Sequence, residues 1–371
     1  MGDDGVSFHS VSATWATIGD RDRDGSAVRL TRFATSRGLT QVFVAVPDTS
    51  AHDPGTDPGA DALHLVGAGL HAEGIAVSAA GIRARWALDP RPFLRWIHGV
   101  RSEDAEAPGV DAVHLDVEAW RLREWDADRQ RVTRGLVDLL RLAREAVPDL
   151  PLSADLPHWL AGEPYWPPPT GVDPSRAETP GPSPGPAVTT GGAPSSRGRI
   201  RPAEGTPPTI TPPRGASAVP GGGEGVRQLA ALPAALPDEP GMPGVPGARM
   251  VEPPTVAAPR RSQRSVFDEA LRYLDAVTIL VPRTHTHGLG GILDASARAR
   301  EACALGGVPY LIGVEARARA AARSARPTFH DEGATALLRE ADRLAEALAG
   351  DALFLGVAVR DWAAWEGLGG A

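Results

Sequence analysis

The stretch Asp111-Ala-Val-His-Leu-Asp-Val-Glu118 alternates polar and apolar side chains, which is the pattern of a β-strand with one apolar face. Its other face carries a histidine, an aspartate and a glutamate, and three such groups cost free energy unless that face lines a site. Asp116 and Glu118 are two residues apart, so their Cα atoms lie roughly 6–7 Å apart. At that distance one carboxyl influences the protonation of the other. The alternative is an edge strand whose polar face meets water.

Apolar runs of strand length continue on both sides of this stretch, separated by helical patterns. We expect strands at 13–18, 41–46, 75–79, 112–118, 152–155, 276–281, 310–314 and 352–359. We expect helices at 27–36, 61–72, 92–100, 127–147, 266–274, 292–305 and 335–349. This alternation is typical of parallel βαβ units, and eight units close into an α/β (β/α)₈ TIM barrel of about 250 residues. A doubly wound open sheet is the alternative, but no Gly-rich phosphate loop follows the first strand.

A change of composition interrupts the barrel pattern at residues 164–262. Runs such as Pro167-Pro168-Pro169 and Gly221-Gly222-Gly223 alternate there with small polar residues, and hydrophobic periodicity is lost. Such a segment cannot bury enough apolar surface to offset the entropy of ordering it. We therefore predict a long Pro/Gly-rich disordered insertion after strand five. Residues 1–163 then carry strands one to five, and residues 263–371 carry strands six to eight.

Composition limits the partners and the location of the protein. The 371 residues carry a formal charge of −8 and no basic block interleaved with aromatic residues, which makes nucleic acid an unfavourable partner. Cys303 is the single cysteine, so no intramolecular disulfide forms. No signal peptide and no apolar run of bilayer length is visible. We expect no transmembrane segment, no cofactor and a cytoplasmic location, or an extracellular or cell-wall location if the first residue is not the native start.

Polar and aromatic residues gather where the expected strands end, which is where TIM barrels carry their chemistry. Aromatic rings beside carboxylates suit a sugar, because its C–H faces stack on rings while its hydroxyls need polar partners. For each tryptophan taken alone, packing in the core or at the rim is an equal alternative. The candidate substrate-binding residues are Asp111, Trp86, Trp120, Asp155, His158, Trp159, Arg283, Glu315 and Trp362.

Four segments resemble a known family. Asp111-x-x-His114-x-Asp116-x-Glu118 resembles the Asp-x-x-Asp-x-Asp-x-Glu signature on strand four of family 18 glycoside hydrolases. Together with three further segments it resembles a group of bacterial chitinase-like TIM-barrel proteins. The resemblance covers both flanks of the insertion and skips the insertion itself. The three further segments are Leu152-Ser-Ala-Asp-Leu-Pro-His-Trp159, Gly313-Val-Glu-Ala316 and Thr328-Phe-His-Asp-Glu-Gly333.

The resemblance implies a hydrolase that acts on a glycan or oligosaccharide containing N-acetylhexosamine. Glu118 would be the general acid that protonates the glycosidic oxygen. Asp116 would hold a proton and orient the acetamido group of the substrate, which attacks the anomeric carbon. A neutral His114 would hydrogen-bond Asp116 from below. These roles are chemically consistent, because two adjacent carboxyls in a partly dry site do not both ionise easily.

Two departures from the family pattern leave other functions open. His114 stands where family 18 enzymes carry a third aspartate, and Pro282 stands where they usually carry a tyrosine that assists the acetamido group. Loss of one such donor typically costs about 10²–10³ in rate, so a catalytically weak or inactive glycan-binding barrel is one alternative. A metal-dependent hydrolase is another, since His285, His287 and His158 are possible ligands together with His114 and nearby carboxylates.

Overall fold

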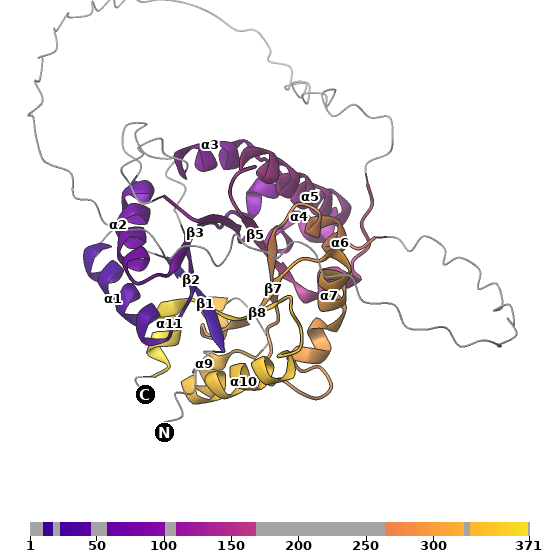
Figure 1. Cartoon of the computed structure of the whole chain (residues 1–371). Coiled ribbons are helices and arrows are strands. Elements are labelled where there is room, and N and C mark those ends of the chain that lie inside the picture. The colour runs from indigo at the N-terminus through magenta and orange to yellow at the C-terminus, as the bar shows by residue number, and fades with distance from the viewer. Residues whose placement is uncertain are drawn as a thin grey trace, which may run out of the picture. The chain divides into compact units, whose positions relative to one another are not determined.

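A computed structural model of the chain describes residues 10–17, 23–45, 58–100, 109–167, 264–322 and 327–369. Its eight strands pair in the order β1 to β8, and β8 pairs with β1, so the sheet is a closed barrel. Every pairing is parallel, and helices surround the strands (Figure 1). The predicted TIM barrel is therefore confirmed, and an open doubly wound sheet is excluded.

The strands lie close to their expected positions. The strand that opened the sequence argument pairs with a neighbour on each side, so it is not an edge strand. The strands are β1 Val11–Thr17, β2 Gln41–Ala45, β3 Ala76–Gly81, β4 Ala112–Leu115, β5 Leu152–Pro157, β6 Ala276–Leu280, β7 Tyr310–Glu315 and β8 Phe354–Arg360.

The helices also follow the expected rhythm. The helix expected at 127–147 is α5, which begins at Arg129 because the Asp128 side chain accepts a hydrogen bond from Arg131 N (3.0 Å), and the unpredicted short helix α4 ends just before it at Ala127. The α-helices are α1 Arg23–Ser36, α2 Pro58–Ala72, α3 Arg91–Val100, α4 Glu124–Ala127, α5 Arg129–Ala146, α6 Val266–Leu271, α7 Ile292–Gly306, α8 Arg319–Ala322, α9 Phe329–Glu332, α10 Ala334–Ala347 and α11 Trp362–Gly367; the 3₁₀ helices are η1 Ala84–Ala87, η2 Ala119–Arg121 and η3 His158–Gly162.

Two apolar layers hold the barrel together. The larger layer lies between the strands and the surrounding helices. A smaller cluster comes from β1, β2, β3, β7 and β8 and is centred on the rings of Trp15 and Phe43, which are 5.0 Å apart. Its other members include Ala13, Ala80 and Ala358, and these small side chains leave room for the two rings. The small cluster forms the floor on which the polar residues of β4, β5 and β8 rest.

The two ends of the predicted insertion meet at one point. Pro164 and Ser265 form an antiparallel bridge, and Tyr165 N donates to Arg264 O over 2.8 Å. Strands β5 and β6 pair directly, from Ser153 with Ala276 to Pro157 with Leu280. The barrel therefore closes across the insertion, as expected. Disorder was predicted for residues 164–262; Pro164 and Tyr165 are instead held at this junction, and residues 168–262 lie outside the described residues.

None of the helices within the described ranges combines the length and the apolar character needed to cross a bilayer.

Candidate active site

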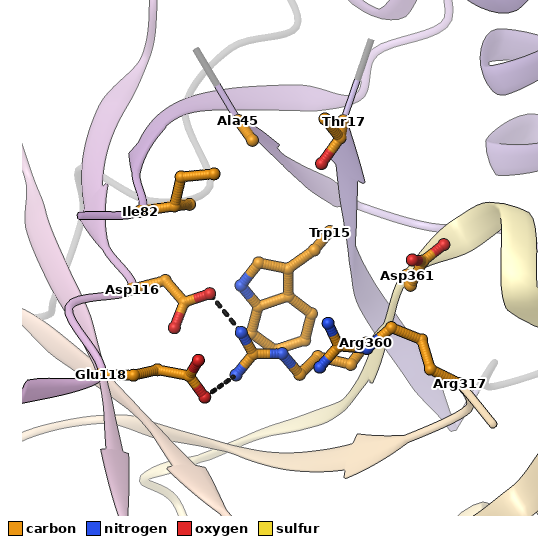
Figure 2. A pocket seen from close by; sticks show the side chains of 9 residues that line it. All are labelled: Trp15, Thr17, Ala45, Ile82, Asp116, Glu118, Arg317, Arg360 and Asp361. Atoms are coloured by element: carbon orange, nitrogen blue, oxygen red, sulfur yellow. Dashed lines mark hydrogen bonds and ion pairs between the residues drawn. The ribbon is translucent and has the colours of Figure 1, made fainter. Parts of the chain in front are cut away.

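Strand β4 and the residues after it deliver three titratable side chains to the mouth of the barrel. His114 lies within β4 and is fully buried. The chain stays beside β3 after the strand ends, because Asp116 N donates to Gly81 O over 2.9 Å. Asp116 is buried and Glu118 is 18 % exposed in its side chain. Figure 2 shows both carboxyls directed toward the same guanidinium group.

That guanidinium belongs to Arg360, the last residue of β8. Its Nη2 donates to Asp116 Oδ2, and its Nη1 lies 3.5 Å from Glu118 Oε1 and 3.6 Å from Asp155 Oδ2. The guanidinium also lies over the ring of Trp15, 5.6 Å from its centroid. One nearly buried arginine thus interacts with three carboxyls from two neighbouring strands, and Trp15 supports it from below.

The histidine of β4 contacts a different aspartate from the one we expected. His114 Nε2 lies 3.0 Å from Asp155 Oδ1, and Nδ1 lies 2.8 Å from Ser153 Oγ. Burial lowers the pKa of His114 to about 3, so the ring is neutral and has one donor and one acceptor. The predicted hydrogen bond from His114 to Asp116 is wrong, because β5 carries Asp155 into the barrel directly beside the ring. The ring also stacks on Phe43, with centroids 4.0 Å apart.

Burial raises the pKa of all three carboxyls. Desolvation is the largest cause in each case and outweighs the attraction of Arg360, so the pKa of Asp116 rises to about 6 and that of Asp155 to about 7. The pKa of Glu118 is also raised. Asp116 Oδ1 and Asp155 Oδ2 are both buried and have no hydrogen-bond partner among the described residues, and each carboxyl influences the pKa of the other. The two groups therefore titrate together, and the pair retains a proton near neutral pH.

Two cavities open at this end of the barrel, and both contain Glu118 and Arg360 in their walls. The first, the carboxylate pocket, has a volume of about 190 Å³ (Figure 2). The second, the tryptophan pocket, has a volume of about 250 Å³. The carboxylate pocket is lined by Trp15, Thr17, Ala45, Ile82, Asp116, Glu118, Arg317, Arg360 and Asp361. The tryptophan pocket is lined by Glu118, Trp120, Arg121, Pro157, Trp159, Leu280, Val281, Pro282, Gly313, Val314, Glu315, Ala322 and Arg360.

Ion pairs fix the charged side chains around the two pockets. Arg121 Nε lies 2.8 Å from Glu118 Oε2, and Arg121 Nη2 donates to Ala322 O over 3.0 Å. Arg317 donates to both oxygens of Glu315, over 2.9 and 2.7 Å. Each oxygen of Glu118 therefore lies beside an arginine. Both oxygens of Glu315 accept hydrogen bonds from Arg317.

Backbone strain is present at the edge of the carboxylate pocket. Asp361 has a φ of +68°, and within the described residues it is the one non-glycine residue with a positive φ. Its side chain accepts a hydrogen bond from Ala364 N over 3.0 Å and caps α11. A non-glycine residue in this region typically costs of order 1–3 kcal/mol, and the cap offsets part of that cost.

Several predicted substrate-binding residues lie at this mouth. Trp120, Trp159 and Glu315 line the tryptophan pocket, together with Pro282. Asp155 lies deeper, below Asp116, and titrates together with it.

Two other predicted residues lie after strands β5 and β6 but line neither pocket. His158 Nδ1 lies 3.1 Å from Leu280 O. Arg283 donates to Gly290 O and to Pro282 O, over 2.9 Å each, and so stabilises the loop after β6. Neither residue lines these two pockets, so contact of His158 and Arg283 with a substrate stays a prediction.

Asp111 lies at the opposite end of β4 from the two pockets. Its carboxylate accepts a hydrogen bond from Val77 N over 2.7 Å and lies 2.8 Å from His71 Nε2. It therefore joins β3 and α2 to the start of β4. The family signature placed Asp111 with the site, but the direction of the strand separates the two.

Two of the predicted tryptophans are part of the apolar core. Trp86 is 2 % exposed and packs against Phe93 and Trp96, because β3 ends at Gly81 and η1 turns the chain. Trp362 is 4 % exposed and packs against Phe33 of α1. Neither ring reaches a pocket, which corrects the prediction of sugar stacking for these two residues.

The histidines of the loop after β6 do not converge on a common point. His285 and His287 are exposed, whereas His114 is enclosed by the barrel. In the part of the chain that the structure describes, no three histidine, cysteine, aspartate or glutamate side chains are placed to hold a metal ion together. This arrangement gives no support to the metal-dependent alternative.

The list of candidate residues omitted several residues that line the pockets, four of which carry the argument. Trp15, Thr17 and Arg317 line the carboxylate pocket, and Arg360 lies between the two pockets. One signal was available for the last of them, because a charged residue closes the apolar run of β8 at its carboxyl end. In a TIM barrel a charge at that position faces the mouth.

Comparison with known proteins adds no family assignment. No model of a known protein family matches the chain, and a search of the curated proteins gives no significant match. Functional inference therefore rests on the residues and on the geometry of this mouth.

Proposed function

We propose that the protein is a glycoside hydrolase that acts on a glycan containing N-acetylhexosamine, with the substrate's own acetamido group as the nucleophile. The observation that supports this proposal most is the pair formed by Asp116 and Glu118. Both carboxyls face one pocket at the carboxyl end of the barrel, and both have a raised pKa. A raised pKa favours the protonated form that a general acid requires.

The reaction follows from the position of each group. Glu118 donates a proton to the glycosidic oxygen as the bond to the anomeric carbon breaks. The acetamido oxygen of the same sugar attacks that carbon, while Asp116 accepts a hydrogen bond from the acetamido N–H and stabilises the positive charge that develops there. Glu118, now a carboxylate, removes a proton from water as the water opens the cyclic intermediate. Water is consumed and Glu118 regains its proton.

Two neighbouring residues prepare Asp116 for this role. Asp155 titrates together with it and the pair retains a proton, while neutral His114 holds Asp155 through the 3.0 Å contact. Transfer of that proton toward Asp155 leaves Asp116 as the hydrogen-bond acceptor when the acetamido group becomes positive. Arg360 contacts both aspartates and keeps the net charge of the group low.

Product analysis by mass spectrometry tests the proposal. N-acetylglucosamine oligomers and peptidoglycan fragments are incubated at pH 5 to 7 with the wild type and with Glu118→Gln. Glu124→Gln is the matched control, because Glu124 lies in α4, pairs with Arg85 and lines neither pocket. We expect cleavage by the wild type and the control and a loss of at least 10²-fold in Glu118→Gln. Equal cleavage by all three proteins would refute the assignment.

A second candidate is a glycan-binding barrel without turnover. The ion pairs of Glu118 with Arg121 and Arg360 favour this function. They stabilise the ionised form of Glu118 relative to the protonated form that a general acid needs. The presence of Pro282 in place of a tyrosine favours it as well. Oligosaccharide binding by the wild type that produces no cleavage, and that persists in Glu118→Gln, would establish this function instead.

A further inference from the structure

The two pockets differ in which catalytic carboxyl they contain. Glu118 lies in the wall of both pockets, whereas Asp116 lies in the wall of the carboxylate pocket alone. Asp116 must contact the acetamido group of the sugar whose bond is broken, so that sugar occupies the carboxylate pocket. Glu118 protonates the oxygen on the far side of the bond. The leaving group attached to that oxygen therefore enters the tryptophan pocket.

The walls of the tryptophan pocket are mostly apolar. The rings of Trp120 and Trp159 meet edge to face, with centroids 6.0 Å apart, and the remaining apolar wall comes from the ends of β5, β6 and β7. Its volume of about 250 Å³ exceeds the roughly 150 Å³ of a protein cavity that binds benzene. A single aromatic ring or a short alkyl chain fits this space.

The charged side chains Glu315 and Arg121 in the wall of that pocket already have partners. Glu315 is held at both oxygens by Arg317, and Arg121 bonds Glu118 and Ala322 O. A sugar placed in the pocket would bring several hydroxyls next to tryptophan, proline, leucine and valine side chains, and hydroxyls buried without partners are costly. Among the residues described, the wall is therefore better suited to an apolar group than to a second sugar.

We infer that the tryptophan pocket binds an apolar aglycone, so that the substrate is an aryl or alkyl glycoside of an N-acetylhexosamine rather than a chitin-like chain. This inference rests on the proposed function, because that function assigns the sugar to the carboxylate pocket. In the reaction the bond from the anomeric carbon to oxygen breaks and the aglycone leaves as a phenol or alcohol with the proton from Glu118. Water supplies the hydroxyl of the released sugar and restores the proton on Glu118.

Calorimetric binding of sulfur-linked analogues tests the inference, because they resist cleavage. The probes are the methyl and phenyl 1-thio-β-glycosides of N-acetylglucosamine and the sulfur-linked disaccharide of N-acetylglucosamine. We expect the phenyl compound to bind the wild type at least tenfold more tightly than either other probe, which corresponds to about 1.4 kcal/mol.

Two tryptophan variants locate the preference. Trp159→Ala is expected to reduce the phenyl preference to less than threefold, and Trp159→Phe is expected to keep most of it and to show that the fold tolerates change there. Trp166→Ala is the matched control, because Trp166 also follows β5, is 47 % exposed and lines neither pocket. It should keep the full preference.

The possible failures are distinguishable. Equal binding of the methyl and phenyl compounds, or a phenyl preference that survives in Trp159→Ala, would overturn the inference while leaving the proposed function in place. Tighter binding of the disaccharide than of the phenyl compound would show that the pocket takes a sugar, and would also overturn it. If none of the three probes binds the wild type, both the inference and the proposed function are wrong.

Discussion

The substitution Asp155→Asn tests whether the pair of buried aspartates holds protons in the folded state. Asp155 has a pKa of about 7 in the fold, against an ordinary value of 3.8, because burial penalises its charge. Between these two values the folded protein keeps a proton that the unfolded chain has released. This group therefore lowers the unfolding free energy as the pH rises, and its contribution is complete only above about pH 7.

The magnitude follows from the two pKa values. They differ by about three pH units, and each unit corresponds to about 1.4 kcal/mol, so ionised Asp155 costs about 4 kcal/mol of stability at pH 8. Asparagine carries no charge, and its amide oxygen accepts the hydrogen bond from His114 that the carboxylate accepts. We expect Asp155→Asn to be more stable than the wild type at pH 8, by an amount that shrinks to near zero at pH 4.

Urea unfolding between pH 4 and 8 measures this difference. His114 has a lowered pKa, so it makes the fold less stable as the pH falls below about 6.5. Because His114 contacts Asp155 directly, the difference is assigned to Asp155 between pH 6.5 and 8, where the ring is mostly neutral in both proteins. Loss of the Asp155 charge also lowers the pKa of Asp116, which changes the difference in the same direction. Asp138→Asn, at an exposed carboxyl of α5, is the control. Parallel curves for the wild type and Asp155→Asn would refute the proton retained by this pair.

Three other perturbations have outcomes that the structure determines. Arg360→Met leaves the buried carboxyls of Asp116 and Asp155 without their cation, so we expect a loss of about 3–5 kcal/mol in urea unfolding at pH 7; a loss below 1 kcal/mol would contradict the role of this arginine. Arg121 is a partly exposed partner that lowers the pKa of Glu118, so Arg121→Met should move the alkaline limb of the pH–rate profile to higher pH while costing at most about 1 kcal/mol of stability. Gly135→Ala places a Cβ 1.8 Å from Ala87 O, so thermal unfolding should show a large loss of stability, whereas Gly109→Ala, with no atom within 4 Å, should not.

Much of the barrel was predictable because apolar residues repeat at different spacings in strands and in helices. The strands from β2 to β7 were predicted to within a few residues at each end. A predicted boundary was wrong where a single side chain sets the end of an element. The helix expected from residue 127 begins at Arg129, because Asp128 caps α5. Trp86 was predicted to bind substrate at the end of a strand, but a 3₁₀ turn carries it into the core beside Phe93. No local pattern distinguishes those two conformations.

The site was predictable only where its residues belong to one strand. Asp116 and Glu118 follow from the alternation within β4, and spacing alone places them near each other. The partner of His114 did not follow, because the register of β5 against β4 decides that it is Asp155. Arg360 comes from the other end of the chain, and β8 brings it across the mouth to Asp116. Contacts between strands depend on how the barrel closes. A periodic sequence pattern predicts that it closes, but not which side chains of different strands then meet.

The junction at Pro164 and Ser265 marks where the barrel sequence divides into two parts. The outermost strands of each part pair with those of the other. The first part ends with β5 and begins with β1, and the second begins with β6 and ends with β8, so two strand pairings join them. Glu118 and Asp116 come from the first part and Arg360 from the second. Two polypeptides made separately, covering 1–167 and 264–371, would each carry an incomplete charge cluster, and only their association would complete it.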